Sequence, residues 1–195
     1  MKKLFWIIIP SLLVVFMLTR SGQSDDEYTQ EIVEYWEDKH DFYANSQASP
    51  FVQKGVPYEE VPVYSADKNF KVNANLSRFT TRELVSLGNS DGTSTRYLKF
   101  ALAQFKINGV QQELLILKAL GFGNQYLTAF GDETSGVSTY GGGRYLDLAI
   151  GKSDRVEIDF NKAYNPYCAY FEDFTCPLPP QENLLTVEIK AGEKL

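Results

Sequence analysis

The residues whose types and spacing could do chemistry gather in the last third of the chain, between residues 130 and 194. The clearest of them is Arg144, which directly follows the three glycines Gly141–Gly143. Glycines let a backbone approach a neighbour closely, and an arginine beside such a turn can hold a carboxylate or phosphate with two hydrogen bonds. The glycines form neither G-x-G-x-x-G nor a P-loop, so they do not predict a nucleotide site. The alternative is that Arg144 pairs internally with an aspartate, and the candidates are Asp132, Asp147 and Asp159.

A second group of polar and aromatic side chains lies between residues 159 and 183, and Tyr140 adds to it. Their oxygens suit a polar ligand or a hard cation such as Ca²⁺, but the spacing fits a calcium loop at Asp159 and Asn161 and then fails. The alternative is turn chemistry, because Asp and Asn side chains satisfy turn backbones by themselves. We predict no metal and no cofactor. The side chains expected to bind a small ligand are Tyr140, Arg144, Asp159, Asn161, Tyr164, Asn165, Tyr167 and Asn183.

The chain has two cysteines, Cys168 and Cys176, with seven residues between them. In an oxidising compartment they could form one disulfide that closes a short loop and contributes about 2–3 kcal/mol to stability. Reduced structural thiols and a metal or redox pair are the alternatives, although the spacing is neither C-x-x-C nor a known zinc pattern. Half of the 8 prolines lie from Pro166 to Pro180, in a long connection of the kind that often carries function on a β scaffold.

Catalytic groups are sparse in this sequence. His40 is the only histidine, and Ser135 does not lie in G-x-S-x-G, so a Ser–His–Asp site is not predicted. A hydrolase could instead use Asp147 and Asp159 as paired carboxylates, or Cys168 as a nucleophile with a carboxylate or tyrosine as its base. The sequence does not decide between an enzyme and a binding protein.

Short runs in the same region resemble one known family. They are Asp132–Gly136, Thr139–Tyr140, Gly143–Leu146, Asp159–Asn161, Ala163–Pro166, Cys168–Tyr170, Cys176–Pro180, Glu182–Asn183 and Ala191–Lys194. Together they resemble the signature of the family called domain of unknown function 1684, specifically from about Phe130 to Lys194 and more loosely before that. The chain departs from the signature at Tyr167, where a second proline is common. The resemblance implies no established activity, and it supports a single domain over residues 24–195.

A mainly β domain must position these residues. Short apolar-rich runs separated by turn signals predict about eight strands, which are Tyr58–Tyr64, Asn69–Asn75, Arg96–Ile107, Val110–Leu120, Gln125–Phe130, Arg144–Ile150, Arg155–Phe160 and Leu184–Lys190. Asn108-Gly109 between two long apolar-rich runs predicts a hairpin with a type I′ turn. Strands at this spacing are typical of an antiparallel barrel-like or sandwich domain.

One amphipathic helix is expected before the strands, from Glu27 to Asn45. Apolar residues recur there at helical spacing, and Ile32 and Trp36 are expected to pack on the domain. Ser24 can cap the start of the helix, and Ser49-Pro50 ends it. His40 lies among charged neighbours on this helix, so we expect a surface residue there and not a ligand.

The first 23 residues are typical of a targeting segment. Lys2 and Lys3 precede the apolar run Leu4–Leu18, whose 15 residues would span about 22 Å as a helix, against about 30 Å for a bilayer core. The length therefore favours a secretory signal peptide over an uncleaved membrane anchor. Its removal takes away three positive charges and no acid, which changes the formal charge from −6 to −9. A domain this acidic disfavours nucleic acid and anionic lipid as partners.

These observations predict an exported, periplasmic or otherwise extracytoplasmic domain whose membrane contact is limited to residues 4–18. We expect it to bind a small polar or anionic ligand or a cell-envelope component. The site would lie where the turn at Gly141–Gly143 meets the loop 165–180. The alternatives are the hydrolase described above and a purely structural envelope protein without a pocket.

Overall fold

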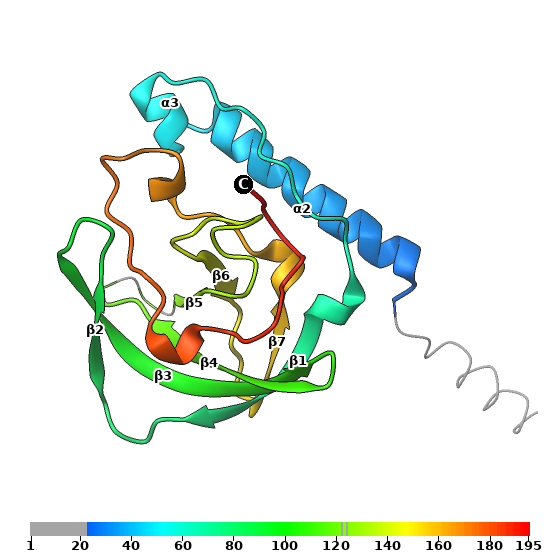
Figure 1. The fold of residues 1–195 in the computed structure, drawn as a ribbon, viewed down its shortest axis with the longest axis vertical. Helices are drawn as coiled ribbons and strands as arrows, with labels where there is room; N and C mark the ends of the chain where they lie inside the picture. Colours follow the sequence, from blue (N-terminus) through cyan, green and yellow to red (C-terminus); the bar gives the residue numbers. More distant parts are fainter. Residues whose placement is uncertain (1–22, 122, 124) are drawn as a thin grey trace, which may run out of the picture.

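A computed structural model describes residues 23–121, 123 and 125–195, which form a mainly β domain with one long helix at its N-terminal side (Figure 1). The predicted leader, residues 1–23 with the apolar run 4–18, lies outside the described residues except for Gln23. No helix within the described ranges combines the length and the apolar character that crossing a membrane requires.

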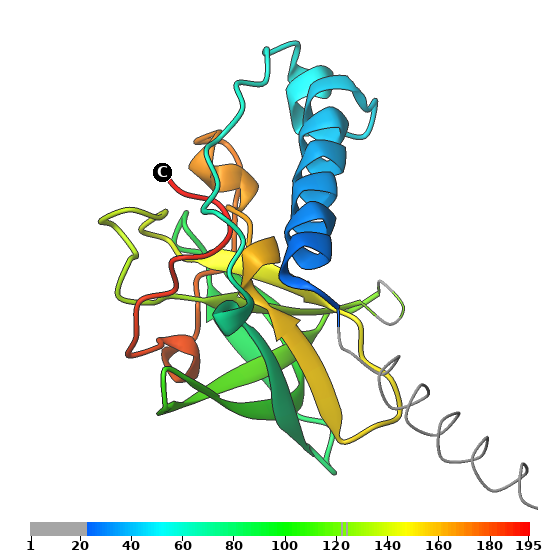
Figure 2. The same cartoon turned by 90° about the vertical axis from the view of Figure 1, so that its right-hand side faces the viewer.

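Helix α2 (Asp25–Asn45) has nearly the predicted bounds. Its start is capped twice, because the Ser24 hydroxyl accepts a hydrogen bond from the Glu27 amide and the Glu27 carboxylate accepts one from the Ser24 amide. Its buried residues include Ile32 and Trp36, as predicted. Helix α3 (Pro50–Lys54) follows after Ser49. Figure 2 shows α2 beside the loops at one end of the sheet. The helix does not cover the sheet itself.

Seven antiparallel strands form one curled sheet, a half barrel. Their order is β6-β5-β4-β3-β1-β7, and β2 pairs with β3 off this path. The strands are β1 (Lys71–Arg78), β2 (Leu84–Gly88), β3 (Ser94–Ile107), β4 (Val110–Lys118), β5 (Tyr126–Phe130), β6 (Arg144–Leu148) and β7 (Arg155–Asp159). The hairpin β3–β4 turns at Asn108 and Gly109, which have φ angles of 50° and 80°, as a type I′ turn requires.

Strand β4 of the hairpin is buried on both faces from Leu114 to Leu117, whereas Gln104 and Lys106 of β3 are exposed. Leu114 and Ile116 of β4 face the main core inside the curl of the sheet. Leu115 and Leu117, which alternate with them, face a second cluster on the other side, where Leu87 of β2 packs against them. Because successive side chains of a strand point to opposite faces, two small cores form around one strand.

Two predicted strands are wrong. The segments 58–64 and 184–190 are not strands and make only isolated bridges in the described structure, at Val63 with Glu193 and at Leu184 with Gly131. Strand β2 was not predicted, because its residues lack the alternation of a half-buried strand. The C-terminal segment instead runs across the open side of the half barrel (Figure 1), where Leu185, Ile189 and Ala191 join the main core. Packing and side-chain hydrogen bonds replace strand pairing there.

Candidate functional site

Arg144, the strongest candidate of the sequence, is part of an internal clamp. Its side chain is 1% exposed, and Nη2 donates to Asp132 Oδ2 at 2.9 Å and to the Ile189 carbonyl at 2.8 Å. Nη1 donates to the carbonyls of Ala191 and of Glu193. This guanidinium holds the C-terminal segment over the half barrel and has no room for a ligand. The prediction that Arg144 fixes an anionic ligand therefore does not fit, and the internal alternative with Asp132 does.

Asn183 has a similar internal role at the edge of β4. Its Oδ1 accepts from the Leu115 amide at 2.6 Å, and its Nδ2 donates to the Leu115 and Ala129 carbonyls and to the Thr128 hydroxyl. The side-chain amide makes the hydrogen bonds to the backbone that a neighbouring strand would otherwise make, so it is not available to a ligand.

Asp159 and Asn161 join the sheet to helix α2. The Asp159 Oδ1 accepts from the Tyr28 hydroxyl at 2.8 Å and from Asn161, whose amide group also donates to the Asp67 carbonyl. The Trp36 indole donates to the Asn161 carbonyl at 2.9 Å. These contacts fit the turn-chemistry alternative. Asp159 is thus engaged beneath α2 and does not join Asp147 in the paired-carboxylate arrangement of a hydrolase.

The two segments that the sequence singles out do meet. Gly143 has a φ of +84°, and a Cβ at this position would overlap Pro179 and the Phe130 carbonyl. The Tyr145 hydroxyl donates to the Pro177 carbonyl at 2.5 Å. A groove of about 560 Å³ lies beside this contact, between Gly141–Gly143 and Leu184. Its charged lining residues are Asp132, which Arg144 neutralises, and the exposed Glu133, so it offers little chemistry for holding a ligand.

A second cavity, of about 430 Å³, lies between α2, β6 and the segments 164–167 and 174–177. We call it the tyrosine pocket, after the residues that define it, which are Tyr43, Tyr145, Tyr164 and Tyr167 with Lys39 and Asp147. Figure 1 shows the orange loop that includes residues 174–177 running from the region of α3 down toward the sheet. The volume lies in the range of small-molecule sites.

Strand β6 explains why Arg144 and the tyrosine pocket have different surroundings. Arg144, Leu146 and Leu148 are buried toward the core, whereas Tyr145 and Asp147 point to the opposite face. Tyr164 then pairs its backbone with that of Tyr145, by hydrogen bonds of 2.8 and 3.0 Å, and its hydroxyl donates to Asp147 Oδ2 at 3.0 Å. One strand thus supplies both the internal clamp and one wall of the pocket.

Helix α2 supplies Lys39, the one cation that lines the pocket among the described residues. Its Nζ lies 3.7 Å from the centre of the Tyr164 ring and 5.4 Å from that of Tyr43. Among the residues that the structure describes, no carboxylate oxygen lies within 4.0 Å of this ammonium and no hydrogen bond to it is formed. Aromatic faces attract a cation but offer it no directed acceptor.

Burial shifts the pKa values of the pocket residues in characteristic directions. It lowers the pKa of Lys39, and the charges of Glu193 and Asp147 oppose this shift. It raises the pKa of Tyr164, as do the charge and hydrogen bond of Asp147. The tyrosine hydroxyls are therefore neutral donors near neutral pH, and the faces of the rings favour the charged form of Lys39.

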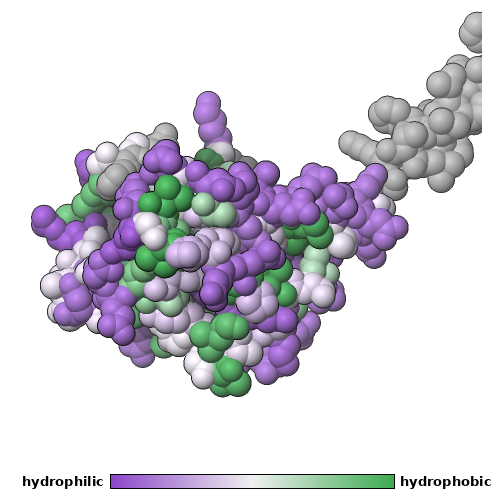
Figure 3. Space-filling model, turned by 90° about the horizontal axis from the view of Figure 1, so that it is seen from above, coloured by the Kyte–Doolittle hydropathy of each residue, from purple (hydrophilic) through white to green (hydrophobic). Residues whose placement is uncertain are grey.

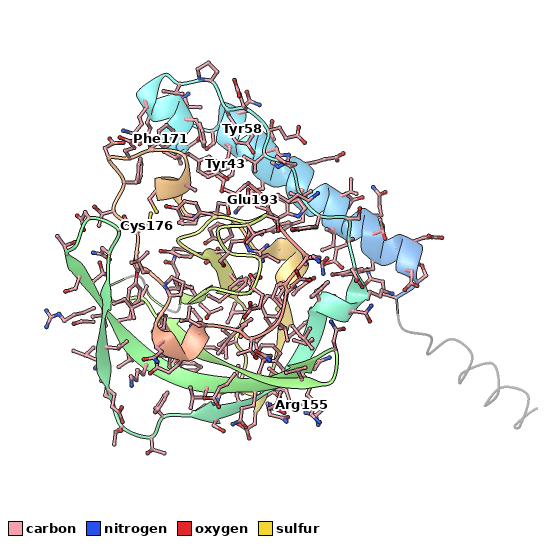
Figure 4. All side chains as sticks on the ribbon, in the orientation of Figure 1. Tyr43, Tyr58, Arg155, Phe171, Cys176 and Glu193 are labelled. Carbon is pink, nitrogen blue, oxygen red and sulfur yellow. The ribbon has the colours of Figure 1, made fainter. Side chains whose placement is uncertain are left out.

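Glu193 lies directly behind the pocket and is completely buried. Its Oε2 accepts from the Asn165 amide at 2.5 Å and from the Tyr170 hydroxyl at 3.0 Å, whereas Oε1 has no partner in the described structure. Burial raises the pKa of Glu193. Figure 4 shows Tyr43, Tyr58 and Glu193 close together below α2. The carboxyl group therefore tunes the charge beside Lys39 without lining the pocket.

The cysteines are free thiols in this structure, and Cys176 lines the tyrosine pocket. Cys176 Sγ accepts a hydrogen bond from the Cys168 amide at 3.2 Å. The Tyr140 hydroxyl donates to the Cys168 carbonyl at 3.5 Å, and Tyr140 does not reach the pocket. In the described part of the chain, no group of three or more His, Cys, Asp or Glu side chains is arranged to hold a metal ion.

Of the eight predicted ligand-binding residues, the structure brings Tyr164, Asn165 and Tyr167 into one pocket. Sequence reasoning missed Lys39 and Tyr43. Both lie on the helical stripe whose spacing predicts packing on the domain, and a lysine inside an aromatic stripe was the signal that could have found them.

A family model described as "Protein of unknown function (DUF1684)" matches residues 57–194. No curated protein matches the chain. Among solved structures, the chain is similar to an uncharacterised protein of Haloarcula marismortui, determined by solution NMR. The two share 29% sequence identity with a TM-score of 0.66, and the match covers 87% of this chain and 95% of that protein. These comparisons establish a family and a fold, and they assign no ligand.

Proposed function

Because the chain belongs to the DUF1684 family, whose description assigns no activity, we propose from the geometry of its site that the protein binds a small organic anion in the tyrosine pocket. The observation that carries this proposal is the ammonium of Lys39, which is partly buried among aromatic rings and lacks a carboxylate partner in the described structure. An unpaired cation that has lost part of its hydration gains more from an incoming anion than an exposed one does.

The pocket also limits what kind of anion fits. Four tyrosine rings provide flat apolar walls, and the hydroxyls of Tyr43 and Tyr167 together with Asn165 provide a few polar contacts. The hydroxyls of Tyr145 and Tyr164 already donate to Pro177 and Asp147. A site of about 430 Å³ with such walls suits a carboxylate attached to an aromatic or short hydrocarbon body. A free inorganic anion would leave the aromatic walls unused.

A cationic ligand is the opposite possibility, because aromatic cages often hold quaternary ammonium groups. Here Lys39 itself lies on the face of Tyr164, at 3.7 Å, and its charge repels a second cation. Asp147 is turned toward the Tyr164 hydroxyl. Both features favour an anion with an apolar body.

A hydrolase is less well supported by this geometry. Asp147 lines the pocket, but Asp159 is held beneath α2 by Tyr28 and Asn161. Cys168 does not line the pocket, and Cys176, which does, has a thiol whose pKa burial raises to about 12. We therefore prefer a binding protein to an enzyme.

We further propose that the protein is exported and acts outside the cytoplasm, with residues 4–18 as a signal peptide or membrane anchor. The pattern of Lys2 and Lys3 followed by an apolar run supports this. Seen from above, the described surface is mostly hydrophilic with separate small apolar patches (Figure 3), which suits contact with water on that face. In an oxidising compartment Cys168 and Cys176 would form a disulfide.

Calorimetric titration with matched ligands tests the proposal. Phenylacetate and phenylacetamide have nearly the same shape, and only the first carries a charge. We expect phenylacetate, or a larger aromatic carboxylate of the same series, to bind at least about 10-fold more tightly than its amide, because a hydrogen bond to a charged group is worth about 1.5–3 kcal/mol. Equal affinities of acid and amide through the series would contradict the role of Lys39.

A further inference from the structure

Cys168 and Cys176 form a pair of thiols beside the tyrosine pocket, and binding of an anion at Lys39 makes no use of them. The Cys168 amide donates to Cys176 Sγ at 3.2 Å. Burial and, after it, a hydrogen bond with the Cys168 thiol raise the pKa of the Cys176 thiol. Two sulfur atoms eight residues apart in the chain therefore lie close together in the fold.

The backbone holds both cysteines in place. The Cys176 amide donates to Ser90 Oγ at 3.3 Å, and its carbonyl accepts from the Ser90 amide at 3.0 Å. Cys168 lies in the short helix η3 (Tyr167–Ala169), and Tyr140 donates to its carbonyl. Cys176 Sγ already lies 3.2 Å from the Cys168 amide, so the two anchored side chains start close together.

The two thiols differ in how easily they can react. Cys176 is 7% exposed, and burial raises its pKa to about 12, although the Cys168 amide partly offsets this. Cys168 is half-buried and reaches solvent. The thiolate is the attacking species in thiol–disulfide exchange, so a buried thiol of high pKa is a poor first nucleophile.

We propose that Cys168 and Cys176 are an ordered redox site, in which Cys168 receives the oxidising equivalent from an incoming disulfide and Cys176 resolves it. The Cys168 thiolate attacks one sulfur of the incoming disulfide, whose S–S bond breaks, and the first thiol leaves with the proton that Cys168 has lost. Cys176 then attacks the Cys168 sulfur, the mixed disulfide breaks, and the second thiol leaves with the proton of Cys176. Two thiols of the protein become one disulfide, and one incoming disulfide becomes two thiols.

The proposed bond would fix one wall of the tyrosine pocket. Phe174, Thr175 and Cys176 line the pocket, and the loop that carries them is tied to α3 by the contact of Phe171 with Phe51, at 4.8 Å between ring centres. In Figure 4, Phe171 lies by α3 and Cys176 lies at the other end of this loop. The expected effect of this disulfide on ligand binding rests on the proposed function, whereas the thiol chemistry itself does not.

Trapping of the intermediate tests the order of the two steps. The full chain is reduced, freed of reductant, exposed to oxidised glutathione and quenched with acid for intact-mass analysis. We expect the wild type to lose two hydrogens without accumulating an adduct. The variant Cys176→Ser should retain one glutathionyl group on Cys168, and Cys168→Ser should react at least about 10-fold more slowly, because Cys176 is buried and burial raises its pKa.

An adduct that forms on Cys168→Ser as fast as on Cys176→Ser, or a stable mixed disulfide in the wild type, would overturn the proposal. Should a serine variant fail to fold, peptide mapping of the wild-type time course gives the same order, because the transient glutathionyl group must lie on Cys168. In denaturant both cysteines should react equally. Calorimetric binding of phenylacetate to the reduced wild type is measured separately, which distinguishes failure of the redox site from failure of the anion site.

Discussion

Arg144 and Lys39 are two cations that the same domain uses in opposite ways. The guanidinium of Arg144 meets Asp132 and three main-chain carbonyls, and all of these partners belong to the chain itself. The ammonium of Lys39 meets aromatic faces and lacks a directed acceptor among the described residues. A buried cation whose terminal amino groups are paired inside the fold stabilises that fold, whereas an ammonium without a partner marks a place where a ligand can add one.

The largest expected effect is on stability, and it concerns Arg144, the cation that is paired inside the fold. Arg144→Met removes the partner of Asp132, which is completely buried, and frees three carbonyls, so we expect a loss of about 3–5 kcal/mol in the free energy of unfolding. Urea denaturation followed by circular dichroism measures it. The matched control is Arg155→Met on the exposed start of β7, labelled in Figure 4, which should change stability by less than about 0.5 kcal/mol. Equal small effects would show that the clamp is not structural.

A smaller effect is expected from Glu193, which lies between the two cations. Its pKa is raised in the folded protein, so its contribution to stability is fully present below about pH 4 and is lost as the pH rises through the raised pKa. Glu193→Gln stays neutral, so its stability relative to the wild type should increase over that pH window. The increase should be about 1.4 kcal/mol for each pH unit by which folding raises the pKa of Glu193.

Thermal unfolding from pH 4 to pH 8 checks the pH dependence, with Glu172→Gln as an exposed control. The groups that face Glu193 are Lys39, Arg144 and the tyrosines Tyr35, Tyr43, Tyr58 and Tyr170. The tyrosines do not titrate in this window, because their pKa values are raised. Parallel curves for the wild type and Glu193→Gln would mean that folding does not raise the pKa of Glu193.

The smallest expected effect concerns the wall of the tyrosine pocket that Phe174 and Thr175 form. Closing a disulfide between Cys168 and Cys176 would hold Phe174 and Thr175 in place and so reduce the ordering cost of binding. We expect oxidised protein to bind aromatic carboxylates roughly two- to fivefold more tightly than reduced protein, by calorimetry on the two forms. Weaker binding after oxidation would indicate that the wall must move to admit the ligand.

The sequence was informative about elements with strong local signals. Ser24 marked the start of α2, and Asn108-Gly109 marked the main hairpin, because capping and positive φ angles depend on local residue types. The composition of the Leu184–Lys190 run predicted a strand that does not form. The actual role of this run depends on Arg144, some 45 residues away, and no local pattern reports such a contact.

The sequence predicted only the part of the candidate site that has a local signal. Tyr164, Asn165 and Tyr167 belong to a segment whose composition already indicated a site. Arg144 and Tyr145 are neighbours in sequence, yet strand alternation sends one into the core and the other into the pocket, and the register of β6 decides which. Lys39 joins them through the packing of a distant helix, which the amphipathic pattern of α2 predicted without showing what it would face.

The most direct test of the central claim is a calorimetric comparison of Lys39→Met with Lys194→Met, using the best-binding aromatic carboxylate. Lys194 also places its ammonium over a tyrosine ring, that of Tyr64 at 4.6 Å, but it lies outside the tyrosine pocket. The account predicts that Lys39→Met weakens binding by about 10-fold to 150-fold with little loss of stability, and that Lys194→Met changes it less than about twofold. Unchanged affinity in Lys39→Met, or equal losses in the two variants, would contradict it.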